Sequence, residues 1–478
     1  MLNKTAEEHT GRVSLKTRLS YGIGGFGKDF GLIAINTFLF FYYTDIIGVS
    51  AAFVGTVFLF ARIWDTINDP IMGYIVSKTK TRWGKYKPWI LVGNLLNAIF
   101  IVALFSAHLF TGTEQLVFIA VTYVGWGMTY TLLDAPFWSM IPTITLDKGE
   151  REKLMPYPRL FASLGGYLAS GLGVAAVNFL GNGDEARGYL LFAVACALLA
   201  IISALVTCAW TEQNIEVSED PDQSFNIRDA LTLVFGNDQF ITLMLIAFLF
   251  CFSANMTAGL NLYFYTYVLN DNSLFSAAML WAGIFGTGSL IVFPRLVDAF
   301  GRRTIFSFSL LMPVVSAMVL FVVANFTQGS VFLIALAGIA FGLSNALYWL
   351  MAILMVADCV DYGDYKLNMR SESVSYSTHT LIFKCTSALT GFLVGVCLTV
   401  INYVPNQVQS AETLNGLQLV YLAPAATCLI ALVVYRYFYR LNGSVLDKVQ
   451  HALEQRYVKT DRVPQDSYDA TISPVMVI

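Results

Sequence analysis

The sequence has few charged residues. Only 13% of its 478 residues are Asp, Glu, Lys or Arg, and 56% are hydrophobic. Soluble domains carry about 25% charged residues, so this composition predicts a membrane protein. The net charge of −3 carries little information by itself, and no nucleic-acid partner is predicted.

The sequence also lacks the patterns that mark most catalytic and metal sites. Its seven cysteines are scattered, mostly in apolar stretches, without a disulfide or metal-ligand spacing. It contains no nucleophile–base motif and no phosphate-binding glycine loop, which argues against a polytopic membrane enzyme and a resident cofactor. The polar first residues do not resemble a cleavable signal peptide, so we expect the first span to act as an internal insertion signal.

Long apolar runs fill most of the chain. A helix needs about 20 mostly apolar residues to cross a bilayer. We identify twelve such runs, at residues 20–46, 51–77, 88–109, 115–144, 158–181, 187–211, 237–267, 274–298, 304–325, 330–356, 373–403 and 413–440. The sequence therefore predicts an all-α membrane protein with twelve transmembrane helices.

Basic residues set the orientation of these spans. They gather in the N-terminal segment and after the second, fourth, eighth and tenth spans, whereas the alternate connections contain one basic residue, Arg187. By the positive-inside rule both termini are cytoplasmic. A short basic connection follows the second span of each half, which matches the parallel repeats of the major facilitator fold. The predicted parts are a cytoplasmic N-terminal segment (1–19), a first six-helix bundle (20–211), a cytoplasmic loop (212–236), a second six-helix bundle (237–440) and a cytoplasmic tail (441–478).

Charged residues inside the second span point to a cation site. A charge at the bilayer centre costs roughly 2.5–3.5 kcal/mol, so such residues usually face a cavity and carry function. Asp65 and Asp69 are four residues apart and share a helical face with Asn68. Their partner could be a proton, a metal cation or a basic side chain. Hard cations prefer carboxylate, amide and hydroxyl oxygens, so we predict a Na⁺ site that Thr131 completes.

The fourth span carries a pattern typical of sugar binding. Tyr130, Asp134 and Trp138 recur at intervals of four residues. A carboxylate can accept hydrogen bonds from sugar hydroxyls while an indole covers the C–H face of the ring. Trp138 could instead be a packing residue. Trp349 and Arg159 are further candidates, since a guanidinium can bind ring hydroxyls or neutralise nearby acids.

Charges of both signs also gather at the cytoplasmic ends of the spans. We predict that they form ion pairs that close the cytoplasmic face while the site opens outward, although solvated loop charges would give the same pattern. The candidates for this cytoplasmic gate are Arg151, Glu152, Arg295, Arg302, Asp358, Asp361 and Arg370.

Several motifs together resemble one transporter family. SYGIGGFGKDF, ARIWDTINDPIMGYIV, WGMTYTLLDAPFWSMIPTIT and VADCVDYGDYKLNMRSES are similar, with matched spacing, to the melibiose carriers. These belong to the glycoside–pentoside–hexuronide:cation symporter family of the major facilitator superfamily. The resemblance runs from about Ser14 to Leu441 and implies a multi-pass protein of the bacterial inner membrane.

The resemblance implies uptake of melibiose or related galactosides coupled to Na⁺, Li⁺ or H⁺ by alternating access. Sugar and cation are then the small-molecule partners, with membrane lipid around the chain. Two departures affect the sugar preference: Asn36 replaces a tyrosine of the family pattern, and His379 replaces an amide. A sugar sensor without transport is the alternative. The family's cation-site residues fall on Asp65, Asp69, Asn68 and Thr131, and its sugar-site residues on Lys28, Asp29, Tyr130, Asp134, Trp138, Arg159, Trp349, Thr380 and Lys384.

Overall fold

The computed structural model is all-helical in the part of the chain that it describes. That part comprises residues 13–79, 81–145, 150, 153–212, 227–327, 329–369, 371–405 and 407–459. Within a few helices inside this part, the side chains of some residues, Asp69 among them, are not described.

The described part of the N-terminal half contains six long helices and three short segments. The long helices are α1 (Leu15–Phe41), α2 (Ala51–Lys78), α3 (Lys87–Leu104), α4 (Gly112–Ser139), α7 (Pro156–Gly181) and α8 (Glu185–Trp210). The short segments are η1 (Tyr42–Ile46), η2 (Ala107–Leu109) and α5 (Ile141–Ile144).

The C-terminal half repeats this plan. Its long helices are α10 (Asp238–Tyr263), α11 (Ser273–Phe300), α12 (Arg302–Val322), α13 (Val331–Leu367), α14 (Glu372–Val400) and α15 (Ala411–Phe438). The segments η3 (Phe264–Val268) and η4 (Val323–Thr327) extend two of them. Two further helices, α9 (Ile227–Gly236) and α16 (Ser444–Lys459), lie in the regions predicted as the cytoplasmic loop and tail.

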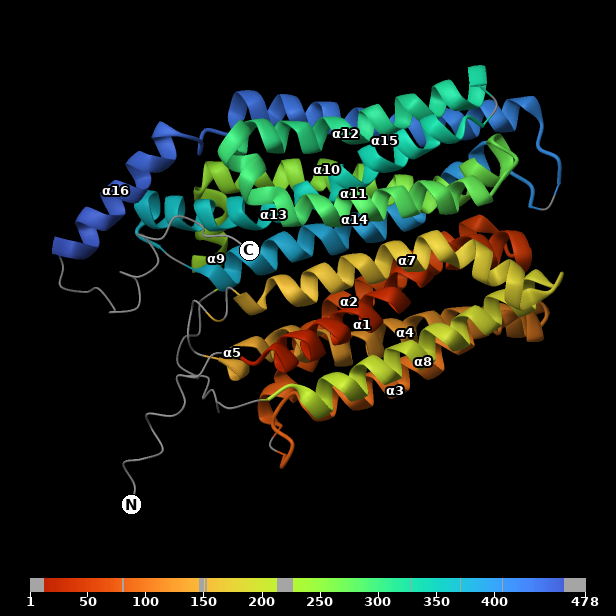
Figure 1. Cartoon of the computed structure of the whole chain (residues 1–478), viewed down its shortest axis with the longest axis horizontal. Coiled ribbons are helices and arrows are strands. Elements are labelled where there is room, and N and C mark those ends of the chain that lie inside the picture. The colour runs from red at the N-terminus through yellow and green to blue at the C-terminus, as the bar shows by residue number, and fades with distance from the viewer. Residues whose placement is uncertain are drawn as a thin grey trace.

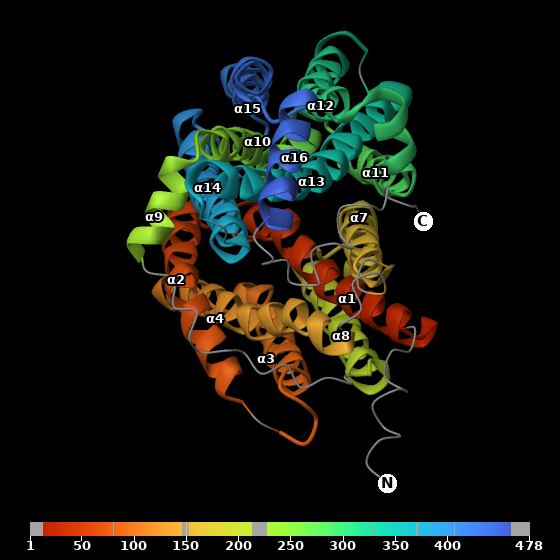
Figure 2. The same cartoon turned by 90° about the vertical axis from the view of Figure 1, so that its left-hand side faces the viewer.

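Two groups of helices lie side by side (Figures 1 and 2). Helices α1–α8 form one group and α10–α15 the other, and α9 and α16 lie at the end of the bundle where α1 begins. The groups meet where α2 packs on α14 and α7 packs on α11. This arrangement confirms the predicted helical membrane fold, with the candidate site residues of α1, α2 and α4 inside the first group.

Ten of the described helices are long and apolar enough to cross a membrane. The remaining long helices, α1 and α2, have comparable lengths of 27 and 28 residues but carry charges in their middle. Helix α13 is longer than predicted and ends at Leu367 rather than near residue 356. Its acidic residues Asp358 and Asp361 therefore lie within a helix, where the sequence analysis had placed them after the span.

The buried apolar clusters differ between the two ends of the bundle. At the end opposite α9 and α16, one continuous cluster contains residues of both halves, such as Phe41 and Tyr263. At the other end each half has its own cluster, around Phe137 in the first half and Tyr348 in the second. The positive-inside rule predicts that the α9 end is cytoplasmic, which would put the end where the halves pack together at the extracellular side.

Candidate functional site

A buried lysine organises the first cluster of predicted site residues. Lys28 of α1 is 7% exposed. Its Nζ lies 2.7 Å from Asp29 Oδ1, 2.6 Å from Asp134 Oδ1 and 3.1 Å from the Tyr130 hydroxyl. A buried ammonium is stable only when it is paired and hydrogen-bonded, and these partners from α1 and α4 satisfy it.

Asp134 accepts hydrogen bonds from side chains on its own face of α4. Besides Lys28, the Trp138 indole N–H donates to Asp134 Oδ1 at 3.1 Å, and the Tyr130 hydroxyl lies 3.4 Å from the same atom. The spacing of four residues that the sequence analysis emphasised therefore corresponds to direct contacts along the helix. Asp134 keeps 33% of its side chain exposed and Asp29 keeps 23%. Carboxylates that stay accessible within a helical bundle face a polar cavity rather than lipid.

Arg159 joins this cluster from α7. Its guanidinium carbon lies 4.4 Å from the centroid of the Trp138 ring, a cation–π distance. Close approach of α1 to α7 helps to bring Arg159 and Lys28 to the same indole, that of Trp138. A Cβ at Gly25 would lie 2.7 Å from the Pro158 carbonyl oxygen, so only glycine fits there. Arg159 also covers part of the indole, so a sugar can stack on Trp138 only on the remaining ring surface.

The predicted cation-site residues of α2 and α4 form a second cluster. Asp65 is buried, and its Oδ2 lies 3.3 Å from Arg62 Nη1. Its other oxygen, Oδ1, is buried and makes no hydrogen bond within the described part of the chain. The Asn68 amide nitrogen, also buried, has no hydrogen-bond partner there either. Asp65 therefore has a basic partner on one oxygen and an uncompensated second oxygen.

Helix α4 forms the other wall of this cluster. Asp65 Oδ1 packs directly on Gly127, where an added Cβ would lie only 2.6 Å from it. The buried Thr131 hydroxyl, one turn further, donates to the Gly127 carbonyl at 3.2 Å. The side chain of Asp69 lies outside the described part, so its contribution stays a prediction. Among the described residues, no group of three or more His, Cys, Asp or Glu could hold a metal.

The C-terminal half contributes to the two clusters unequally. Lys384 of α14 interacts electrostatically with Asp65 and Arg62. This associates it with the Asp65 cluster rather than with the Lys28 cluster, where the resemblance had placed it. Trp349 packs edge-on against His379 and Phe383, with ring centroids 6.0 and 5.2 Å apart. These residues of α13 and α14 form an aromatic group of their own.

Thr380, a predicted sugar-site residue, and Asn36, which departs from the family pattern, make no contact with the Lys28 cluster that we observe among the described residues. The Thr380 hydroxyl donates to the Tyr376 carbonyl of its own helix, and the side chain is exposed. Asn36 is also exposed. Their roles in sugar binding stay predictions.

The predicted cytoplasmic gate is described only in part. Arg302 Nη1 lies 3.1 Å from Asp358 Oδ2, but both residues belong to the C-terminal half, so this pair joins α12 to α13 and not one half to the other. Arg295 is exposed on α11, and Asp361 is half-buried on α13. Arg151, Glu152 and Arg370 lie outside the described residues.

Glu150 and Asp45 are buried acids that the sequence analysis did not identify. Glu150 accepts from Val13 N–H at 2.8 Å, from Arg18 at 2.6 Å and from Lys153 at 3.0 Å, which ties the start of α1 to the segment before α7. Asp45, in η1, is fully buried. The motif YYTDII, which places an acid between aromatic and aliphatic residues, was a signal for Asp45.

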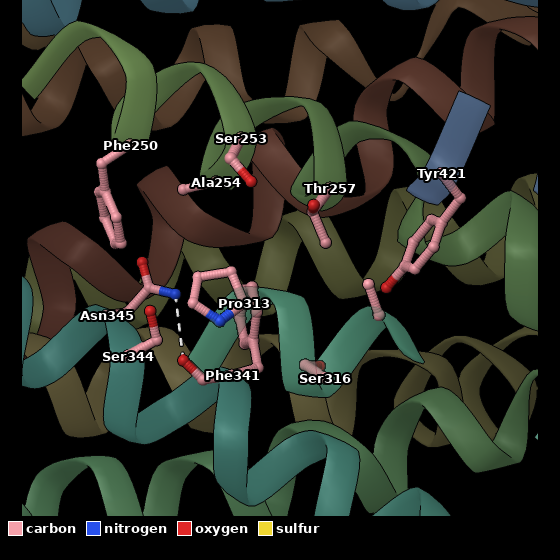
Figure 3. Close-up of a pocket in the computed structure, with 11 residues that line it drawn as sticks. Phe250, Ser253, Ala254, Thr257, Pro313, Ser316, Phe341, Ser344, Asn345 and Tyr421 are labelled. Atoms are coloured by element: carbon pink, nitrogen blue, oxygen red, sulfur yellow. Dashed lines mark hydrogen bonds between the residues drawn. The ribbon is translucent and has the colours of Figure 1, made fainter. Parts of the chain in front are cut away.

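A small cavity lies away from both clusters, in the C-terminal half (Figure 3). Its free volume of about 10 Å³ holds roughly one water molecule and is too small for a sugar. The lining residues come from α10, α12, α13 and α15 and include Ser253, Pro313 and Asn345. We therefore restrict the candidate site to the Lys28 and Asp65 clusters.

Known proteins share this architecture. Solved structures with the same fold include a nucleoside transporter (TM-score 0.65, 15% identity, 89% of this chain and 100% of that chain). Another is a bacterial homologue of human drug peptide transporters (TM-score 0.63, 12% identity, 89% and 99%). At these identities the likeness shows the major facilitator fold alone.

Curated relatives match along nearly the whole chain. A putative sulfoquinovose importer of Salmonella typhimurium is 28% identical over 97% of this chain and 98% of its own. An isoprimeverose transporter of Lactiplantibacillus pentosus is 26% identical over 96% and 95%. A putative glycoside/cation symporter of Escherichia coli is 27% identical over 95% and 98%. The named substrates vary, and none of these three relatives is named for melibiose.

The model of one protein family matches residues 20–443, which include both clusters and both halves. That family is described as MFS/sugar transport protein. Membership excludes the polytopic-enzyme alternative and agrees with a multi-pass membrane protein whose helices form two packed halves. The chain belongs to the MFS/sugar transport protein family of the major facilitator superfamily.

Proposed function

We propose that this chain is a secondary active symporter of the bacterial inner membrane that couples cation entry to uptake of a glycoside. The finer proposal is melibiose or a related galactoside as the sugar, and Na⁺, Li⁺ or H⁺ as the cation. The family assignment supports transport, and the printed name of the E. coli relative supports a glycoside/cation symporter.

The contacts of Asp134 carry the sugar part of the proposal. One carboxylate oxygen accepts from Lys28 and Trp138 beside an accessible indole, and sugar hydroxyls can replace or join these donors. The formal charges of this cluster also balance: Lys28 pairs with Asp29 and Asp134, and Arg159 adds a second positive charge beside Trp138. A balanced set of charges favours a neutral glycoside over an anionic one, because an added anion would remain unpaired.

The uncompensated oxygen of Asp65 carries the cation part. A Na⁺ ion or a proton at Oδ1 would satisfy a buried acceptor that Arg62 leaves unpaired. Helix α4 then links the two proposed sites, because Gly127 packs on Asp65 while Asp134, on the same helix, contacts Lys28. Cation binding that strengthens sugar binding must be matched by an equal effect of sugar on the cation.

Counterflow in membrane vesicles tests transport itself. Vesicles loaded with unlabelled melibiose, and separately with other neutral glycosides, are diluted into the same labelled sugar. Transient accumulation above equilibrium identifies a transporter and ranks the sugars. A sensor that binds sugar without moving it gives no counterflow, and that result would refute the symporter.

The Asp65→Asn variant tests the cation assignment. We expect it to lose stimulation of uptake by Na⁺ or Li⁺ while sugar counterflow persists. Asp184→Asn is the matched control, because Asp184 only caps the start of α8. Stimulation that is unchanged in Asp65→Asn would remove Asp65 from the cation site.

A further inference from the structure

Asp45 is a buried acid that belongs to neither the Lys28 cluster nor the Asp65 cluster. It lies in η1 at the extracellular end of the bundle, opposite α9 and α16 (Figure 1), and it has no exposed surface. A buried carboxylate must be compensated by hydrogen bonds or charges. Its compensation here comes from hydroxyl groups.

The hydroxyl donors come from both halves of the protein. Thr44, its neighbour, donates to Asp45 Oδ2 at 2.7 Å. Tyr267 of η3 donates to Oδ1 at 2.5 Å, and Tyr403, which follows α14, donates to the same oxygen. A carboxylate of the N-terminal half is thus held by two tyrosines of the C-terminal half.

A second bond crosses between the halves at the same place. The Tyr263 hydroxyl lies 2.5 Å from that of Thr44, and the Tyr263 ring packs edge-on against Phe41 with centroids 5.2 Å apart. Helices α2 and α14 also approach closely here, since a Cβ at Gly395 would lie 2.3 Å from the Ala51 carbonyl oxygen. This packing buries Thr44, Asp45 and Tyr263 completely, whereas Tyr267 and Tyr403 are half-buried.

Outward opening of the site must break these bonds. Alternating access separates the halves at one side of the membrane while they close at the other. Hydrogen bonds to a charged acceptor are short and about twice as strong as neutral ones. Lys28 lies 17 residues before Asp45 on the continuous α1–η1 segment, about 25 Å at helical rise, so a rigid helix connects this contact to the sugar cluster.

We propose that Asp45, Tyr267 and Tyr403 form an outer latch that holds the extracellular side closed and sets the balance between inward- and outward-facing states. These are positioning residues for the transport step, since none of them belongs to the sugar or cation cluster. The proposal requires the transporter family but neither the sugar nor the cation proposed above. A result that refutes the latch would therefore leave the proposed sugar and cation unaffected, and a result that refutes either of those would leave the latch unaffected.

A cysteine reporter measures opening at this side. Leu398 of α14 is 1% exposed and lies one turn beyond Gly395, at the level of the bundle where α14 meets α2. The Leu398→Cys variant is labelled from outside intact cells with a membrane-impermeant maleimide. The parent chain with its seven cysteines gives the background rate.

Latch variants are then added to the reporter. We expect Tyr403→Phe and Asp45→Asn to raise the labelling rate about tenfold, from the loss of one hydrogen bond to a charged group. Tyr421→Phe is the matched control, because that buried hydroxyl donates to Asn261 of the same half at 2.7 Å. Tyr403→Phe also keeps the test valid if Asp45→Asn fails to fold.

A second reporter separates opening from general loosening. Val177 is 3% exposed on α7 and packs within the N-terminal half against α8. Opening between the halves leaves labelling of Val177→Cys unchanged while labelling of Leu398→Cys rises. Equal rises at both reporters, an equal rise in Tyr421→Phe, or no rise in the latch variants would each overturn the latch.

Discussion

Adding one methyl group at Gly127 perturbs the Asp65 carboxylate without removing it. The new Cβ would lie 2.6 Å from Asp65 Oδ1 and 3.3 Å from its carboxyl carbon, whereas ordinary contact begins near 3.4 Å. The carboxylate must therefore move by about 0.8 Å. Its Oδ2 is held by Arg62, so the displacement falls on the oxygen that we assign to the cation.

The expected cost follows from overpacking. Extra methylene groups in a packed interior cost about 1–3 kcal/mol. If the methyl group displaces Asp65 from its binding position, this amount reduces the free energy of cation binding. The apparent cation affinity then falls by about 5- to 150-fold. Alanine is favoured over glycine in helices by about 1 kcal/mol, so α4 itself should remain folded.

The assay is sugar uptake in vesicles as a function of Na⁺ concentration. Gly127→Ala should shift half-saturation to higher Na⁺ while uptake at saturating Na⁺ is largely retained. Gly288→Ala is the control, because no atom lies within 4 Å of a Cβ built there. If the Gly127→Ala protein is as abundant in the membrane as the parent and has the parent's half-saturation, Asp65 Oδ1 is not a cation ligand.

Two further variants test individual contacts. Arg159→Lys removes the planar group above Trp138 and should weaken sugar binding about 3- to 30-fold. The Na⁺ concentration for half-saturation should stay unchanged. Binding titrations in which the variant and the parent have equal sugar affinities would contradict this. Burial would raise the pKa of Glu150, but hydrogen bonds from Lys153, Val13 and Arg18 hold it below its ordinary value. The stability from this depressed pKa is present above pH of about 4.3 and is lost as pH falls through the folded pKa. The protection of the amides at the start of α1, measured by hydrogen exchange relative to the intrinsic rate at each pH, should therefore fall on acidification in the parent but not in Glu150→Gln.

The helical fold was predictable because the membrane imposes strong rules on sequence. Apolar runs long enough to span predicted the long helices to within a few residues at most ends. The exception at α13 has a clear cause: the apolar run stops before Asp358 and Asp361, yet nothing ends the helix before Asn368, which adopts the left-handed conformation. Charge ends a membrane span, but it does not end a helix.

The contacts around Asp134 were predictable for a related reason. Tyr130, Asp134 and Trp138 lie on one helix, so their spacing alone brings them together. Glu150 and Asp45 were missed because their partners lie far away in sequence: Tyr403 is 358 residues from Asp45. Neither spacing nor composition encodes a contact between tyrosine hydroxyls of one half and an acid of the other.

The distribution of these contacts separates binding from movement. The groups that surround Lys28, Asp65 and Asp134 belong mainly to α1, α2, α4 and α7, all in one half. Substrate binding at these proposed sites would change the charges within one packed body. Relative movement of the halves is instead opposed where they touch, at α2 with α14, α7 with α11, and η1 with η3. Variants of the residues around Lys28, Asp65 and Asp134 should therefore alter the affinities for substrate and cation. Variants at the contacts between the halves should instead alter the rate and the balance of interconversion between inward- and outward-facing states. Lys384 is the informative exception: it belongs to α14 but interacts with Asp65, so a cation that neutralises Asp65 would also weaken an attraction that holds the two halves together.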